Sequence, residues 1–282
     1  MQFLYNTKIT IILLKVLMAK KKVYGTCLFC CEHKELKRSH TINRTFFNEL
    51  MKSCEATNSA RVVSTNSPII RNSNDNWTDH LLCEGCESYF NQHFDGYGAN
   101  ALRGKIVGQK ISHTDDMVFY QNIDTTNIIL YILSLFWRGA GSKHPSYELL
   151  ITHPNIHKFL IESFQKRQFD SRYINIRISA LYDSFGAADC NAIKQMITSP
   201  FRRVHESNKA FSYFFLFEGF LIEIYFGRLR HAIRKNGAWI APSLKYIKCK
   251  KVDIHSIPEL QKVFTQMFIA KDYMTKNNLA LK

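Results

Sequence analysis

Two cysteine pairs in the first third of the chain have the spacing of a zinc site. Two residues separate Cys27 from Cys30, and two separate Cys83 from Cys86. This spacing lets both thiolates of a pair reach one ion from a tight turn, and two such pairs complete a tetrahedral site. The sequence therefore predicts a structural zinc ion bound by these four cysteines.

Two further residues near the cysteines could take part in hydrolysis. His40 follows Ser39 between the cysteine pairs, and Glu87 comes directly after the second pair. An imidazole can take a proton from water, and a carboxylate suits a hard divalent ion. The alternatives are a structural or zinc-binding histidine at position 40, and a favourable helix-start charge at Glu87.

The order of these residues resembles that of the HNH, or His-Me finger, nucleases built on a treble-clef zinc knuckle. These include phage endonucleases that resolve branched DNA. The family pattern is a CxxC pair, an acidic residue followed by His on a strand, and a second CxxC pair followed directly by Asn or His on a helix. The resemblance covers roughly residues 24 to 103. The stretches LKRSHTIN and LSLFWRGA are also similar to segments of bacterial HNH-like proteins with a "SHIIP" motif.

The resemblance implies a ββα-metal domain in which His40 is the general base and Glu87 binds a catalytic Mg²⁺ or Mn²⁺ ion. It also suggests that Asn76 braces the His40 loop. Ser39 departs from the family pattern, because a neutral hydroxyl stands where an acidic metal ligand is usual. The favoured hypothesis is a metal-dependent endonuclease that hydrolyses phosphodiester bonds of DNA.

A non-catalytic zinc-binding module is the alternative. In that case Ser39 reflects the loss of the metal pocket, and the protein binds nucleic acid or a protein partner, for example as a subunit of a defence complex. The resemblance permits this, because such nucleases of bacteria and phages often serve defence or mobile elements. Salt-sensitive binding without cleavage would favour the alternative. Homo-oligomerisation is left open.

The elements that would position these residues predict an α+β protein with two domains after an extension over residues 1–23. In the zinc-binding HNH-like domain, residues 24–104, apolar spacing favours helices over 44–54 and 84–102, with a loop within 57–79. The C-terminal domain, residues 105–282, is expected to be mostly helical. Its predicted elements are helices near 126–137, 157–166, 191–197 and 258–274, and a β-hairpin over 211–226 that turns at Glu218 and Gly219.

The charge of the chain favours a polyanionic partner, because 38 basic residues against 23 acidic ones give a net charge of +15. Arg38 and Arg44 flank His40, and residues 228–251 form a basic stripe without acidic residues. Such cations would contact phosphates without reading base sequence. The residues predicted to bind nucleic acid are Arg38, Arg44, Arg228, Arg230, Arg234 and Lys235.

The cysteines and the first apolar run indicate a cytoplasmic protein without a membrane partner. Four of the eight cysteines lie in CxxC pairs, and no export signal is recognised, which favours metal binding in a reducing compartment over disulfides. The apolar run over residues 9–17 is too short to span a bilayer. Met18 resembles a natural start, so we expect residues 1–17 to be an upstream extension.

Overall fold

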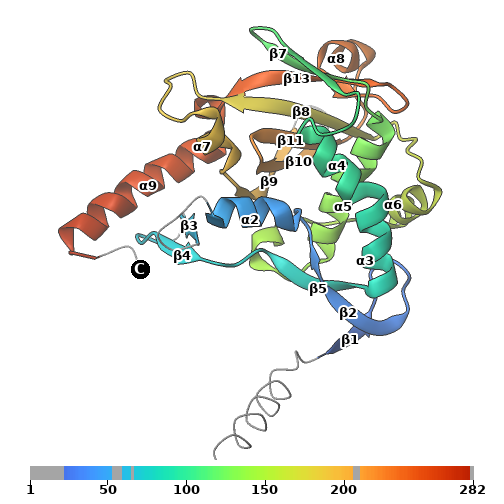
Figure 1. The fold of residues 1–282 in the computed structure, drawn as a ribbon, viewed down its shortest axis with the longest axis horizontal. Helices are drawn as coiled ribbons and strands as arrows, with labels where there is room; N and C mark the ends of the chain where they lie inside the picture. The colour runs from blue at the N-terminus through green and yellow to red at the C-terminus, as the bar shows by residue number, and fades with distance from the viewer. Residues whose placement is uncertain (1–21, 53–58, 65–66, 206–209, 280–282) are drawn as a thin grey trace, which may run out of the picture.

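The computed structural model describes residues 22–52, 59–64, 67–205 and 210–279, and it has an α+β fold (Figure 1). The predicted extension over residues 1–23 lies almost entirely outside the described residues. A three-stranded sheet and its helices carry the four cysteines of the candidate zinc site and are called the zinc-binding part below, and an eight-stranded sheet forms the centre of the remaining chain. The predicted α+β class is therefore confirmed.

The zinc-binding part consists of a small antiparallel sheet and the helices that follow it. Its strands, in spatial order, are β1 (Val23–Thr26), β2 (His33–His40) and β5 (Thr78–Cys83). Its helical elements are α2 (Arg44–Lys52), α3 (Glu84–Phe90), the π-helical turn η1 (Asn91–Asp95) and α4 (Gly96–Leu102). A separate hairpin of β3 (Ala60–Val62) and β4 (Arg71–Ser73) lies in the insert between the cysteine pairs.

One nearly continuous helical run follows the second cysteine pair, as the sequence predicted for residues 84–102. At η1 the backbone N–H of Gly96 donates to the carbonyl of Asn91, five residues earlier, which is the pattern of a π-helical turn. The wider turn changes the register of the side chains. Both Phe94 and Asp95 are buried as a result, with exposed fractions of 0% and 7%.

The prediction of a mostly helical C-terminal domain is wrong, because its centre is a sheet. The strands are β6 (Lys110–His113), β7 (Met117–Gln121), β8 (Ile174–Tyr182), β9 (Thr198–His205), β10 (Ala210–Phe217), β11 (Phe220–Phe226), β12 (Trp239–Ile240) and β13 (Tyr246–Asp253). The alternation that marks a strand is present in β13, where buried Ile247 and Cys249 alternate with exposed Lys248 and Lys250. Interpreting this segment as a basic stripe concealed its strand pattern.

The predicted hairpin over residues 211–226 is confirmed. β10 and β11 pair antiparallel in a register that brings Phe217 opposite Phe220. The two residues between them, Glu218 and Gly219, have φ angles of 52° and 78°. Positive φ at both central residues is the requirement of the tight turns that suit the twist of a hairpin.

The order of strands in the large sheet differs from their order in the chain. It runs β6-β7-β13-β8-β11-β10-β9, and β12 pairs with β8 off this path. The last strand, β13, is therefore an inner strand, antiparallel to β7 and parallel to β8. β8 and β13 end side by side as a result.

Helix α5 (Thr125–Gly141) joins the two parts of the molecule (Figure 1). Asp124 caps its first turn by accepting a hydrogen bond from the backbone N–H of Asn127 at 3.0 Å. Phe136 packs against the large sheet, while Trp137 stacks on Phe90 of α3 with ring centroids 5.4 Å apart. The main apolar core is consequently continuous between the zinc-binding part and the sheet.

The remaining helical elements follow α5 in the chain. They are α6 (Pro154–Lys166), α7 (Cys190–Lys194), α8 (His231–Asn236), α9 (Pro258–Lys276) and the 3₁₀ turns η2 (Pro145–Tyr147) and η4 (Ile254–Ser256). The predicted helices near 157–166, 191–197 and 258–274 correspond to α6, α7 and α9. A smaller apolar cluster beside α7 and α9 covers part of the second face of the sheet.

Candidate metal centre and adjoining polar site

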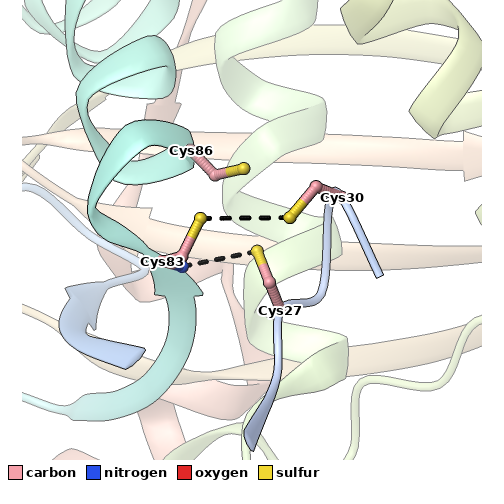
Figure 2. Close-up of side chains that lie close together, drawn as sticks. All are labelled: Cys27, Cys30, Cys83 and Cys86. Atoms are coloured by element: carbon pink, nitrogen blue, oxygen red, sulfur yellow. Dashed lines mark hydrogen bonds between the residues drawn. The ribbon is translucent and has the colours of Figure 1, made fainter. Parts of the chain in front are cut away.

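The four predicted cysteines come together as one cluster (Figure 2). Their sulfur atoms all lie within 4.8 Å of one another, and Cys30 Sγ is 3.9 Å from Cys83 Sγ. Sulfur ligands about 2.3 Å from a tetrahedral zinc ion would be roughly 3.8 Å apart. The spacing and the thiol ligands therefore fit a structural zinc ion.

Backbone groups already favour a thiolate at this centre. Cys83 is the N-cap residue of α3, and its backbone N–H donates to Cys27 Sγ at 3.3 Å. Burial opposes ionisation, but this hydrogen bond and others from neighbouring amides lower the pKa of Cys27 to about 7. A thiolate is the form that binds metal, so Cys27 can lose its proton to solvent easily when a metal ion binds.

Ser39 and Glu87 also meet, on the side of β2 that faces α3. Ser39 is 1% exposed and donates through Oγ to Glu87 Oε2 at 2.7 Å. Burial raises the pKa of Glu87, while the hydrogen bond from Ser39 and the charge of Arg138 act against the rise. These are the two positions at which the resemblance implies ligands of a catalytic ion.

Sequence reasoning missed two residues beside Glu87. Arg138 of α5 is 1% exposed and donates to both carboxylate oxygens of Asp95, at 2.9 and 2.6 Å. Its Nε also donates to the carbonyl of Ser134. Arg138 lies in the LSLFWRGA segment, whose apolar composition indicated a core helix and gave no reason to place a guanidinium beside the zinc-binding part.

These residues do not fit a catalytic Mg²⁺ or Mn²⁺ ion. Glu87 is the single carboxylate at the two implied ligand positions, and the buried hydroxyl of Ser39 occupies it. The guanidinium of Arg138 already supplies positive charge beside Glu87. A magnesium ion normally binds through one or two carboxylates, and the half-buried carboxylate of Glu87 is already paired with Ser39. Asp79 of β5, the carboxylate opposite Ser39 on the neighbouring strand, accepts hydrogen bonds from Ser142 and Lys143 instead.

His40 lies on the other face of β2 from Ser39, as adjacent strand residues must. Its Nε2 is 3.2 Å from Asn76 Nδ2, so the predicted partners are in contact. Arg38 donates to Thr78 Oγ1 at 2.6 Å, and Thr78 is in turn 3.4 Å from Asn76 Oδ1. This chain of polar contacts fixes the side chain of Asn76 and, through it, the imidazole.

The environment of His40 keeps the ring uncharged at neutral pH. Burial lowers the pKa of the imidazole to about 4, and the charges of Arg44, Arg138 and Arg38 act in the same direction. The side chain is half-buried, and Arg38 and Arg44 beside it are exposed. No hydrogen bond or charge interaction links His40 to Glu87 in the described part of the chain. The charge of Arg138 acts on both side chains, which do not contact each other directly.

The cations of the predicted basic stripe do not form one continuous surface. Arg228 lies over the ring of Tyr173, 5.4 Å from its centroid, and Arg234 donates to Asn175 Oδ1 at 3.0 Å. Both side chains therefore have partners within the protein. Arg230 precedes α8 and is exposed.

Most of the remaining cations of the stripe lie on helix α8 and strand β13. The side chain of Lys235 lies outside those that the structure describes. Lys248 and Lys250 point outwards from β13, while Lys251 donates to the carbonyl of Thr114 at 2.7 Å. Cations that are close together in the sequence are thus distributed over two different elements of the fold.

A second group of metal-capable side chains, Asp183, Asp253 and His255, serves a loop. The carboxylate of Asp183 accepts from the backbone N–H of Ala188 at 2.7 Å and lies 2.9 Å from His255 Nε2. Asp253 accepts from Ser184 Oγ at 2.6 Å. These hydrogen bonds hold the chain that leaves β8 against the end of β13.

Comparison of the chain with protein-family models, curated proteins and solved structures returned no match. The resemblance to HNH nucleases consequently rests on the cysteine pairs and the residues around them. In the described part of the chain, no helix combines the length and apolarity needed to cross a membrane.

Proposed function

We propose that this protein is a nucleic-acid-binding protein built on a zinc-stabilised module that has no catalytic metal site of its own. The observation that carries this proposal is the hydrogen-bonded pair of Ser39 and Glu87 beside the buried guanidinium of Arg138. A catalytic cation would need that space and charge. The zinc ion would have a structural role, holding the β1–β2 turn against the end of β5 and the start of α3.

The binding surface in this proposal is the edge of the module near His40. Arg38 and Arg44 are both exposed there, and Arg38 keeps donors free beyond those that contact Thr78. Two guanidinium groups on either side of an uncharged imidazole suit a phosphate backbone, which they would bind without reading the bases. The net charge of +15 would attract the polyanion from a distance.

The test is the salt dependence of binding by zinc-loaded protein to labelled duplex DNA, single-stranded DNA and RNA. We expect the Arg38→Ala/Arg44→Ala variant to bind about tenfold more weakly and to lose about 1.8 from the slope of log affinity against log salt. The matched control is Lys262→Ala/Lys271→Ala, which removes the same charge from exposed positions of α9. Equal losses in the two variants would show that only overall charge matters, which would contradict the proposed surface.

A metal-dependent endonuclease acting on DNA is the second candidate, and the surroundings of His40 favour it. The ring is uncharged at neutral pH, as a general base must be, and Asn76 holds it beside two arginines. For His40 to accept a proton at Nδ1, Asn76 would have to present its oxygen to Nε2. The contacts of Thr78 are compatible with either amide orientation.

Cleavage assays separate the two candidates. Zinc-loaded protein is incubated with plasmid and with branched DNA in Mg²⁺ or Mn²⁺, and the wild type is compared with His40→Ala. We expect no cleavage above background from either protein, and unchanged DNA binding by the variant. Cleavage by the wild type that His40→Ala abolishes would refute the non-catalytic proposal and establish the nuclease.

A further inference from the structure

Three neighbouring strands at one end of the large sheet, β6, β7 and β13, have different surroundings on their two faces. On one face, Ile111 of β6 and Val118 and Tyr120 of β7 line a cavity of about 920 Å³ between the sheet, α2 and α7. Because side chains alternate along a strand, the residues between them point to the opposite face. β7 and β13 lie at the top of the view in Figure 1, whereas β2 of the zinc-binding part lies near the bottom.

Strand pairing places apolar side chains of β7 beside lysines of β13 on this opposite face. Lys248 is opposite Phe119, and Lys250 is opposite Met117. Residues directly opposite each other in paired strands share a face of the sheet. Phe119 and Met117 are half-buried, and they belong neither to the main apolar core nor to the smaller apolar cluster. They therefore form a short apolar strip that stays partly exposed to solvent.

A tyrosine and a third lysine extend the same face along the strands. Tyr246 of β13 and Lys110 of β6 are both opposite Gln121 of β7. Tyr246 is 43% exposed, and Lys248 Nζ lies 5.7 Å from the centroid of its ring. We call this surface the outer sheet face, and it consists of Lys110, Met117, Phe119, Tyr246, Lys248 and Lys250.

The positive charge of the outer sheet face is not compensated. Lys110, Lys248 and Lys250 are exposed, and within the described residues none of them forms an ion pair. The connection between β6 and β7 contributes two exposed carboxylates, Asp115 and Asp116, and neither is paired with these lysines. Three lysines around an exposed ring and an apolar strip favour a polyanion that also offers apolar surface.

A single strand of nucleic acid combines these two properties. Its phosphates supply negative charge along the backbone, and its unstacked bases offer flat faces to aromatic side chains. A duplex keeps the faces of its bases stacked inside the helix, so an exposed tyrosine on a sheet has no base face to contact. Rings beside a positively charged surface are the combination with which proteins bind single strands without sequence preference.

We propose that the outer sheet face binds single-stranded nucleic acid, with phosphates at its three lysines and a base stacked on Tyr246. Phe119 and Met117 would add apolar contacts as the strand crosses β6, β7 and β13. This inference extends the proposed nucleic-acid binding to a second surface and to a particular strand form. It does not depend on Arg38 or Arg44.

The test is fluorescence anisotropy of zinc-loaded, full-length protein with a labelled thymidine oligonucleotide of about 16 nucleotides and with a duplex of equal length. We expect Lys248→Ala/Lys250→Ala to bind the single strand at least tenfold more weakly and to lose about 1.4 from the slope of log affinity against log salt. The control Lys262→Ala/Lys271→Ala on α9 should change the affinity less than twofold. All four lysines are exposed, so neither variant should disturb folding. Comparable losses in the two variants would overturn the assignment.

Substitution of Tyr246 tests the contact with a base. We expect Tyr246→Ala to weaken single-strand binding at least about fivefold and to leave duplex binding unchanged, while Tyr246→Phe keeps the affinity of the wild type. The matched control is Tyr273→Ala on α9, because Tyr273 is 41% exposed, and it should have no effect. An equal loss for single strand and duplex, or no loss in Tyr246→Ala, would refute base stacking at this face.

The arginine variant separates this inference from the proposed surface near His40. Single-strand binding that Arg38→Ala/Arg44→Ala loses and Lys248→Ala/Lys250→Ala retains would overturn the outer sheet face and leave the proposed surface intact. The reverse result would support the outer sheet face and contradict the other surface. Absence of binding to any nucleic acid would contradict both.

Anionic vesicles test the other partner that this charge attracts. We expect Lys248→Ala/Lys250→Ala and its α9 control to sediment equally with vesicles of phosphatidylcholine and phosphatidylserine. A selective loss of vesicle binding in Lys248→Ala/Lys250→Ala, with single-strand binding unchanged, would identify a membrane-binding surface and refute the proposal.

Discussion

Breaking the ion pair between Arg138 and Asp95 should strongly destabilise the protein. Asp95→Ala leaves a guanidinium that is 1% exposed without its bidentate partner. Loss of one member of such a pair costs about 3–5 kcal/mol, because the other charge stays buried. Glu87 and the carbonyl of Ser134 compensate part of that charge, so we expect a loss near the lower limit, about 3 kcal/mol.

The assay is urea unfolding of zinc-loaded protein, followed by tryptophan fluorescence, for Asp95→Ala, Arg138→Met and the double variant. We expect the double variant to be at least about 2 kcal/mol more stable than the sum of the single losses predicts. The control is Asp272→Ala, which breaks an exposed pair with Lys276 and should cost under about 0.5 kcal/mol. A loss below about 1 kcal/mol in Asp95→Ala, or simple additivity, would refute the reasoning.

Three further predictions concern the metal centre, pH and packing. Purified protein should contain one zinc ion, and Cys83→Ser should lose it and lower Tm by about 10 °C, as measured by metal analysis and calorimetry. Because the pKa of His40 is lowered to about 4, its neutral form stabilises the fold above the ordinary pKa near 6.5, and this stability falls as pH drops towards 4. The wild type should therefore lose about 1 kcal/mol more than His40→Gln between pH 7 and 5 in urea unfolding, a value reduced for solvent screening, and equal losses would contradict this. Gly98→Ala should cost at least about 2 kcal/mol, because its methyl group would overlap the ring of Tyr131. Gly85→Ala, in helix α3, meets no atom within 4 Å and should be neutral or stabilise the protein by up to about 1 kcal/mol.

Local patterns were sufficient to predict the zinc-binding part. The CxxC spacing identified the four cysteines, and apolar spacing identified the helical run after Cys83. The contacts of Ser39 with Glu87 and of His40 with Asn76 join positions that the motif had already singled out. These features depend on short spacings and on one motif, which a single sequence contains.

Contacts between distant segments were not predictable in the same way. Arg138 and Asp95 are 43 residues apart, and only the packing of α5 against η1 brings them together. Apart from the β10–β11 hairpin, the large sheet was missed because its pairings join segments far apart in the chain, and because the lysines of β13 concealed its strand pattern. The cavity likewise depends on how α2 and α7 approach the sheet, which no local pattern specifies.

The position of β13 has a consequence for biosynthesis. Residues 246–253 complete the middle of the large sheet, yet they are synthesised after all the other strands of that sheet. Until then β7 and the end of β8 that pairs with β13 each present an unpaired edge, which can recruit another chain. A nascent or truncated polypeptide that stops before residue 246 should therefore depend on chaperones, and aggregation should begin at these two edges.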